Sequence, residues 1–120
     1  MGLLKRIARV RERVRLARSF ISNWPRLVYD LGPELDLHVC WDFHRARLHG
    51  RRRSEDLAIA HEIFVERVYD VESHRPRLGH GTILVDLGAH VGTFSVKWLV
   101  ENPHGRAVGV EPNPANQSLL

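Results

Sequence analysis

The sequence predicts an α/β fold, and the second half of the chain carries the observations that predict it. Residues 82–87 are a short apolar run with an acid near its end, typical of a parallel strand covered on both faces. A glycine loop, 88–92, leads directly into an apolar helical segment, 93–100. A second short strand, 106–111, ends in Glu111. This order of strand, glycine loop, helix, strand and acid is that of a nucleotide-binding βαβ unit.

The residues of this unit suit a ligand that contains adenosine. Gly88 lets a ligand approach the main chain where a Cβ would obstruct it, and Gly92 lets the helix start close against the sheet. Glu111 is placed to accept hydrogen bonds from both ribose hydroxyls. A loop whose glycines served tight packing alone would explain Gly88 and Gly92 but not Glu111.

His90 stands where the dinucleotide fingerprint has its second glycine, the residue that admits a pyrophosphate close to the main chain. S-adenosylmethionine has no phosphate, so it does not need that glycine. The loop therefore favours S-adenosylmethionine over a dinucleotide.

Two stretches carry a resemblance to a known family. Residues 86–95 read Asp-Leu-Gly-Ala-His-Val-Gly-Thr-Phe-Ser, and residues 110–114 read Val-Glu-Pro-Asn-Pro. Together they resemble the opening of the FkbM-type methyltransferases, whose pattern is Asp-x-Gly-Ala-Asn/His-x-Gly followed by a strand that ends in Glu-Pro-Asn-Pro. The resemblance covers roughly 56–120, is strongest from Ile83 onward, and extends less specifically to 62–69.

This resemblance implies a Rossmann-like class I methyltransferase fold and transfer of a methyl group from S-adenosylmethionine to a hydroxyl of a sugar or secondary metabolite. The acceptor would be a small molecule or a glycan. Asp86, Gly88 and Gly92 would shape the methionine end of the site, with Glu111 on the ribose, while His90 either lines the pocket or is a tolerated polar residue. The expected cofactor-binding residues are Asp86, Gly88, Ala89, His90, Gly92 and Glu111.

The Rossmann-like part has two recognisable strands, where five or six are typical, so we expect an incomplete domain that is inactive alone. Asn113 and Pro114 predict the start of a further helix. The acceptor-side residues and the catalytic base are expected beyond Leu120. Two other functions stay open: a basic module that binds nucleic acid or an anionic membrane surface, and a fragment of a dinucleotide-binding oxidoreductase.

The expected organisation is a basic helix in 1–22, a helix and strand extension in 23–81, and the start of the cofactor domain in 82–120. Apolar residues recur at helical spacing over 3–21, with basic residues between them. The apolar stripe either packs on the body, which we favour, or anchors the chain on anionic lipid. A net charge of +4 and a pI near 10.0 favour an acidic partner.

The extension 23–81 is predicted to contain one strand and one helix. Period-two alternation over 35–43 predicts a strand buried on one face, and Arg45 to Arg52 is predicted to continue it as a hairpin with a turn at His49-Gly50. Ser54 is predicted to cap a helix that runs to about Arg67. Breaker residues predict irregular structure or a short helical turn over 22–33 and a loop over 73–81.

Several classes of protein are not favoured. His38, Cys40, Asp42 and His44 alternate along one strand, where they are too far apart to converge on one ion, so we expect no metal site. Cys40 is the single cysteine, and no secretory signal or apolar span is evident, so a reducing cytoplasm fits best.

Overall fold

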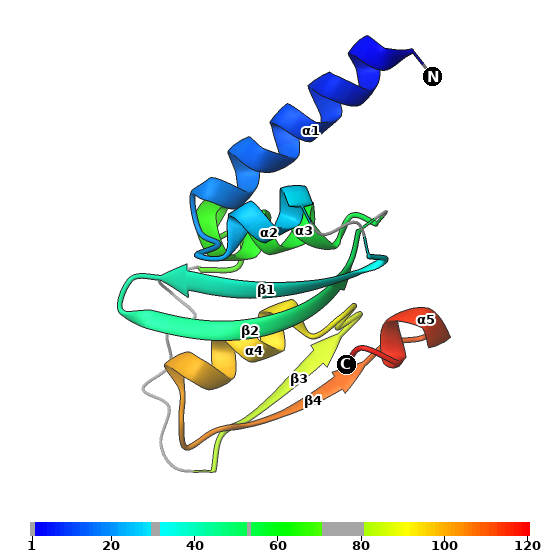
Figure 1. Ribbon diagram of the computed structural model, residues 1–120. Helices are drawn as coiled ribbons and strands as arrows, with labels where there is room; N and C mark the ends of the chain where they lie inside the picture. Colours follow the sequence, from blue (N-terminus) through cyan, green and yellow to red (C-terminus); the bar gives the residue numbers. More distant parts are fainter. Residues whose placement is uncertain (1, 30–31, 53, 71–80) are drawn as a thin grey trace.

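The computed structural model describes residues 2–29, 32–52, 54–70 and 81–120 and has a mixed α/β architecture (Figure 1). Its elements are α1 (Leu3–Arg18), α2 (Trp24–Tyr29), β1 (Glu34–Trp41), β2 (His44–Arg51), α3 (Asp56–His61), the π-helical turn η1 (Glu62–Glu66), β3 (Ile83–Leu87), α4 (Thr93–Glu101), β4 (Arg106–Val110) and α5 (Pro114–Gln117). The predicted loop at 73–81 lies, apart from Gly81, outside the described residues. None of the described helices has the length and apolar content needed to cross a bilayer.

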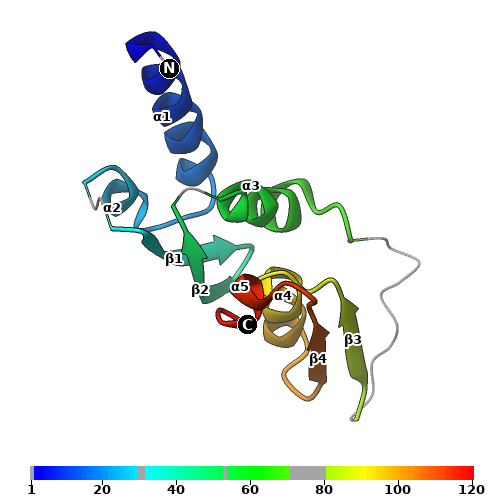
Figure 2. The same cartoon turned by 90° about the vertical axis from the view of Figure 1, so that its right-hand side faces the viewer.

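The elements are arranged in layers. In Figure 1, α1, α2 and α3 lie above the β1–β2 hairpin, and α4 lies between the hairpin and a second sheet made of β3 and β4. Figure 2 shows α3 and α4 on the same side of the hairpin. Helices α3 and α4 therefore both pack against the same apolar face of the hairpin.

The hairpin confirms the predicted alternation but places its turn elsewhere. Leu35, Leu37, Val39 and Trp41 are buried on one face of β1, as period two predicts. The turn lies at Asp42 and Phe43, where Asp42 adopts a φ of 47°. The prediction of a turn at His49-Gly50 was wrong, because both residues lie within β2. Phe43, predicted on the buried face, is fully exposed in the turn.

Gly50 has a packing role in place of a turn role. A Cβ on Gly50 would lie 3.3 Å from the Cβ of Asp56, closer than such atoms usually approach. The glycine therefore lets the start of α3 lie directly against β2.

The main core joins the hairpin to α1, α3 and η1. Leu57, Ala60, Ile63 and Phe64 are buried along one side, as their helical spacing predicts. The rings of Phe64 and Trp41 are in contact, with centroids 4.7 Å apart and planes tilted by 54°.

The helix predicted from the Ser54 cap begins at Asp56, one residue later than a cap at Ser54 would give. Ser54 Oγ nonetheless accepts a hydrogen bond from the Asp56 N–H at 3.2 Å. The helical path continues through η1 and ends at Arg67, whose φ of 55° is left-handed.

Helix α1 is shorter than predicted and packs along only part of its length. It ends at Arg18, and Ile21 instead forms a β-bridge with Val39. Ala17 is buried against the core, whereas Leu3 and Leu4 are exposed. The expectation that the whole apolar stripe packs on the body is therefore wrong for the first half of the helix.

The β3–α4–β4 unit has the predicted order, with β3 and β4 paired in parallel. Helix α4 contacts both strands and β2. The opposite face of the sheet is exposed, in contrast to the prediction of a strand covered on both faces, because among the described residues no element packs on it. Its exposed apolar side chains are Ile83, Val85, Leu87, Val108 and Val110.

A buried lysine joins α4 to the N-terminal part of the chain. Lys97 is 1% exposed, and its Nζ donates to Asp70 Oδ1 at 2.8 Å and lies 2.9 Å from Glu101 Oε1. Glu101 Oε1 also accepts from the Trp41 Nε1–H at 2.9 Å. Every charge in this cluster has a partner, as a buried ionic group requires.

Candidate cofactor site

The carboxyl ends of β3 and β4 meet at one edge, and the glycine loop crosses this edge. Leu87 pairs with Val110, so the two strands end at the same level. The main-chain N–H groups of Gly88 and Ala89 donate to the Val110 carbonyl at 2.8 and 3.1 Å. The loop is therefore tied to the end of β4, at the edge where open α/β sheets bind ligands.

Three loop residues have left-handed backbone conformations. The φ angles are 78° at Gly88, 80° at Gly92 and 55° at His90. Glycine adopts this region without steric cost, whereas His90 has a cost of roughly 1 kcal/mol. The histidine is held there by a hydrogen bond from its own N–H to Glu111 Oε2 at 2.8 Å.

Glu111 connects the glycine loop to the segment that follows β4. Its Oε1 accepts from the Asn113 N–H and its Oε2 from the His90 N–H, both at 2.8 Å. The hydrogen bond from Asn113, followed by that from His90, holds the pKa of the Glu111 carboxyl below its usual value. The Asn116 side chain also lowers this pKa. An ionised carboxylate has about four acceptor positions, and those that remain can accept from hydroxyl groups of a ligand.

Asp86 faces α4 at the end of β3. Its Oδ2 accepts a hydrogen bond from Ser95 Oγ at 2.6 Å, which links the strand to the first turn of the helix. The family resemblance implies that Asp86 shapes the methionine end of the site, and the contact with Ser95 fixes the orientation of Asp86 beside the loop.

The side chain of His90 points toward the N-terminal part of the chain. Its Nε2 lies 3.4 Å from Oδ1 of Asp56, whose side chain is almost completely buried. Two polar atoms at the loop, His90 Nδ1 and Thr93 Oγ1, are buried without a hydrogen-bond partner among the described residues. The loop therefore retains polar groups that its own fold leaves unsatisfied.

Asp56 is the centre of a cluster that holds the loop against the hairpin. The Arg51 side chain donates to both carboxylate oxygens at 3.1 and 3.0 Å, and the Arg51 N–H donates at 2.7 Å. Arg51 Nη2 also donates to Asn116 Oδ1 at 2.7 Å. Burial alone would raise the pKa of Asp56, but the hydrogen bonds from Arg51 outweigh it and lower that pKa.

Sequence reasoning missed this cluster. The prediction placed Arg51 in the hairpin and Asp56 in the helix capped by Ser54, with no contact between them. Asn116 was not singled out. No local pattern relates residues this far apart in the chain, although an acid, an arginine and a histidine at predicted element ends are the residue types that form such clusters.

Ala89 and Gly92 lie in the packed part of the loop. Ala89 is buried, and a Cβ on Gly109 would approach the Ala89 Cβ to 3.1 Å. A Cβ on Gly92 would lie 3.0 Å from Leu120 Cδ1. A ligand that approaches Gly92 from this side therefore has to displace the Leu120 side chain.

The structure thus brings the six expected cofactor-binding residues to one edge of the β3–β4 sheet. Among the described residues, no group of three histidine, cysteine or acidic side chains is arranged to hold a metal ion. No model of a known protein family matches the chain, and no curated protein or solved structure is significantly similar to it.

Proposed function

We propose that this chain provides the S-adenosylmethionine-binding part of a methyltransferase. One observation carries the proposal: an ionised Glu111 at the carboxyl end of β4 is held against the glycine loop by the His90 N–H. Such a carboxylate is suited to bind the two hydroxyls of an adenosine ribose. The resemblance of residues 86–95 and 110–114 to the FkbM-type methyltransferases supports the same assignment.

Each residue has a binding or shaping role in this proposal. Glu111 accepts hydrogen bonds from the ribose, and Gly88 leaves its main chain open because a Cβ there would meet no atom within 4 Å. Asp86, fixed by Ser95, borders the methionine end. When bound, S-adenosylmethionine supplies an activated methyl group on a sulfonium.

The proposed acceptor is a hydroxyl of a sugar or secondary metabolite. The bond that forms joins the methyl carbon to the acceptor oxygen, and the bond that breaks joins that carbon to sulfur. In such a transfer the thioether would leave with the electron pair, and the hydroxyl proton would pass to a base. We assign cofactor binding to the six residues and do not assign the base to any of them.

The dinucleotide alternative is disfavoured by His90. A pyrophosphate requires the main chain to approach closely at this position, and His90 has a Cβ and a ring that extends toward Asp56. An ionised carboxylate behind the loop also opposes the approach of phosphate.

The test is a titration of the isotopically labelled chain with S-adenosylmethionine, followed by amide chemical shifts. We expect saturable shifts confined to residues 88–92 and to Glu111. Glu111→Gln should weaken this binding roughly tenfold, because it removes the charge from the hydrogen bonds to the ribose. Glu34→Gln, an exposed residue of β1, is the matched control and should bind like the wild type.

The same titration with NAD⁺ distinguishes the alternative. Stronger shifts of the loop amides with NAD⁺ than with S-adenosylmethionine would replace the methyltransferase assignment by a dinucleotide one. A folded chain whose loop amides respond to neither compound would contradict both.

A further inference from the structure

The first half of α1 presents apolar side chains to solvent. Leu3 is 73% exposed, Leu4 82% and Val10 53%, whereas Ala17 near the other end is 1% exposed. Figure 1 shows this helix extending away from the rest of the molecule. One apolar stripe therefore begins in solvent and ends in the core.

Basic side chains border this stripe on both sides. At 3.6 residues per turn, Leu3, Ile7 and Val10 lie within an arc of roughly 60°. The same geometry puts Arg6 on one side of the stripe and Arg11 on the other. The only acid of α1, Glu12, lies on the opposite face and pairs with Arg15 at 2.7 Å.

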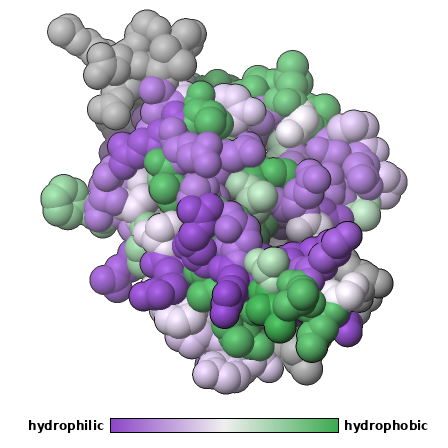
Figure 3. All heavy atoms as spheres, turned by 90° about the horizontal axis from the view of Figure 1, so that it is seen from above, coloured by the Kyte–Doolittle hydropathy of each residue, from purple (hydrophilic) through white to green (hydrophobic). Residues whose placement is uncertain are grey.

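The view of the molecule from above also shows hydrophobic and hydrophilic side chains next to each other. A compact group of hydrophobic side chains lies next to hydrophilic ones on the face toward which α1 projects (Figure 3). The basic residues of the helix are Lys5, Arg6, Arg9, Arg11, Arg13, Arg15 and Arg18. This surface thus combines an apolar stripe with a strong positive charge.

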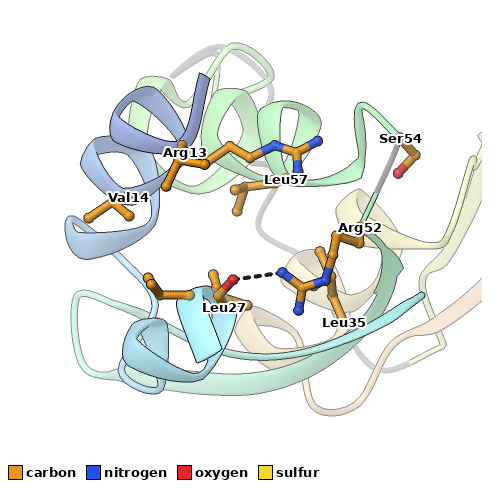
Figure 4. A pocket seen from close by; sticks show the side chains of 9 residues that line it. Arg13, Val14, Leu27, Leu35, Arg52, Ser54 and Leu57 are labelled. Carbon is orange, nitrogen blue, oxygen red and sulfur yellow. Dashed lines mark hydrogen bonds between the residues drawn. The ribbon is translucent and has the colours of Figure 1, made fainter. Parts of the chain in front are cut away.

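A pocket of about 210 Å³ lies at the base of the stripe, between α1, α2, β1 and α3. Val10 and Val14 line it from α1, and Leu57 lines it from α3. Arg13 and Arg52 extend toward it from opposite sides (Figure 4). Arg52 donates to the Leu27 carbonyl at 2.6 Å, and no acidic residue is among those that line the pocket.

We infer that α1 and this pocket form a docking surface for an anionic phospholipid membrane. The first half of the helix, which projects from the body, places its apolar stripe among the acyl chains and its arginines on the lipid phosphates. The pocket receives an acyl chain end below Arg13. The charge complementarity of seven basic residues against one paired acid selects an anionic surface.

The exposed apolar side chains favour lipid over nucleic acid as the partner. Binding to a phosphate backbone uses the arginines alone and leaves Leu3, Leu4 and Ile7 in water. Burial in lipid removes that apolar surface from water as well.

The experiment is co-sedimentation of the full chain with vesicles of phosphatidylcholine alone or mixed with phosphatidylglycerol. We expect binding to the mixed vesicles and little to phosphatidylcholine. Leu3→Ser should weaken binding about tenfold, because a leucine side chain is no longer transferred from water into lipid. Leu87→Ser, which removes an equally exposed leucine from β3, is the matched control and should bind like the wild type.

Charge is tested by a second matched pair. Arg13→Gln should weaken binding about fivefold, and Arg106→Gln, an exposed residue of β4, should not change it. Circular dichroism verifies that each variant folds. Equal binding to both vesicle types, or equal effects of Leu3→Ser and Leu87→Ser, would overturn the inference. Binding to duplex DNA without binding to vesicles would assign the helix to nucleic acid instead.

Discussion

The N-terminal part of the molecule and the β3–α4–β4 unit differ sharply in how they bury their apolar residues. In the hairpin, Val39 is completely buried and Leu37 is 1% exposed. In the paired strands β3 and β4, no residue is fully buried, and Val85 is 58% exposed. The two strands nevertheless have the more distinctive sequence motif.

The difference shows that the motif and the stable core lie in different parts of the chain. The glycine loop is shaped by main-chain hydrogen bonds to Val110 and by Glu111, which provide geometry and little apolar burial. Packing comes from the hairpin with α3 and η1, and α4 connects the two parts through Lys97. We therefore expect stability and ligand binding to respond to different residues.

The largest effect is expected from a change in the core. Leu37→Ala should lower the free energy of unfolding by about 4 kcal/mol, because it leaves a cavity beneath the hairpin. Val85→Ala, on the exposed face of β3, should change it by less than about 0.5 kcal/mol. Urea denaturation measures both, and equal effects would show that the two regions are packed alike.

The next largest loss of stability is expected from the Asp56 cluster, which lies between the two regions. Asp56→Asn removes the carboxylate charge that both Arg51 and His90 face. It should lower the free energy of unfolding by about 3 kcal/mol at neutral pH. Glu55→Gln, at an exposed neighbouring position, is the control and should have little effect.

The same pair of variants tests pH dependence. The pKa of Asp56 is lowered in the folded state, so its contribution is complete above the ordinary aspartate range and is lost as the pH falls through the lowered value. The difference between wild type and Asp56→Asn should therefore narrow below about pH 4. A difference that stays constant in acid would contradict the ionised cluster.

A smaller loss of stability is expected from a change in the glycine loop. Gly92→Ala forces a Cβ into a left-handed conformation and against Leu120, and should cost about 1.5 kcal/mol. Ala115→Gly in the short α5 is the control for a change near the loop. It should lower the stability by less than about 1 kcal/mol, which is typical of exposed helix positions. Thermal unfolding compares the two, and an equal decrease in Tm would show that the φ of Gly92 is not a constraint.

The smallest expected effect is limited to the amide groups that donate to Glu111. As the pH falls, the amide proton shifts of His90 and Asn113 should move together, with a common pKa below the ordinary glutamate value, because both groups donate to Glu111. Glu111→Gln should abolish this shared titration. Amide resonances that titrate separately would indicate that the carboxylate does not connect them.

The elements of the β3–α4–β4 unit could be predicted because their signals are local. Asn113 caps α5 as expected, accepting from the Ala115 N–H at 3.0 Å with Pro114 in the first turn. The glycine loop begins and ends where its glycines do, because only those positions tolerate the required φ without cost.

The hairpin turn and the cluster around Asp56 could not be predicted from local signals. A glycine is a strong turn signal, so the turn was predicted at His49-Gly50, yet Gly50 is needed for close contact with Asp56 in space. The His90 side chain faces Asp56 of α3, and Asp56 is held by Arg51 of β2, both far away along the chain from His90. The exposed face of β3 was also missed, since a continuous apolar run does not specify which faces are covered.

The two lysines of the chain report on different parts of the molecule. Lys5 is exposed on α1, whereas the Lys97 amine is enclosed by Asp70 and Glu101. Reagents that acylate amines should therefore modify Lys5 rapidly and reach Lys97 only when α4 separates from the hairpin. The rate at which Lys97 becomes labelled measures how often the two halves of the protein open, without any mutation or attached probe.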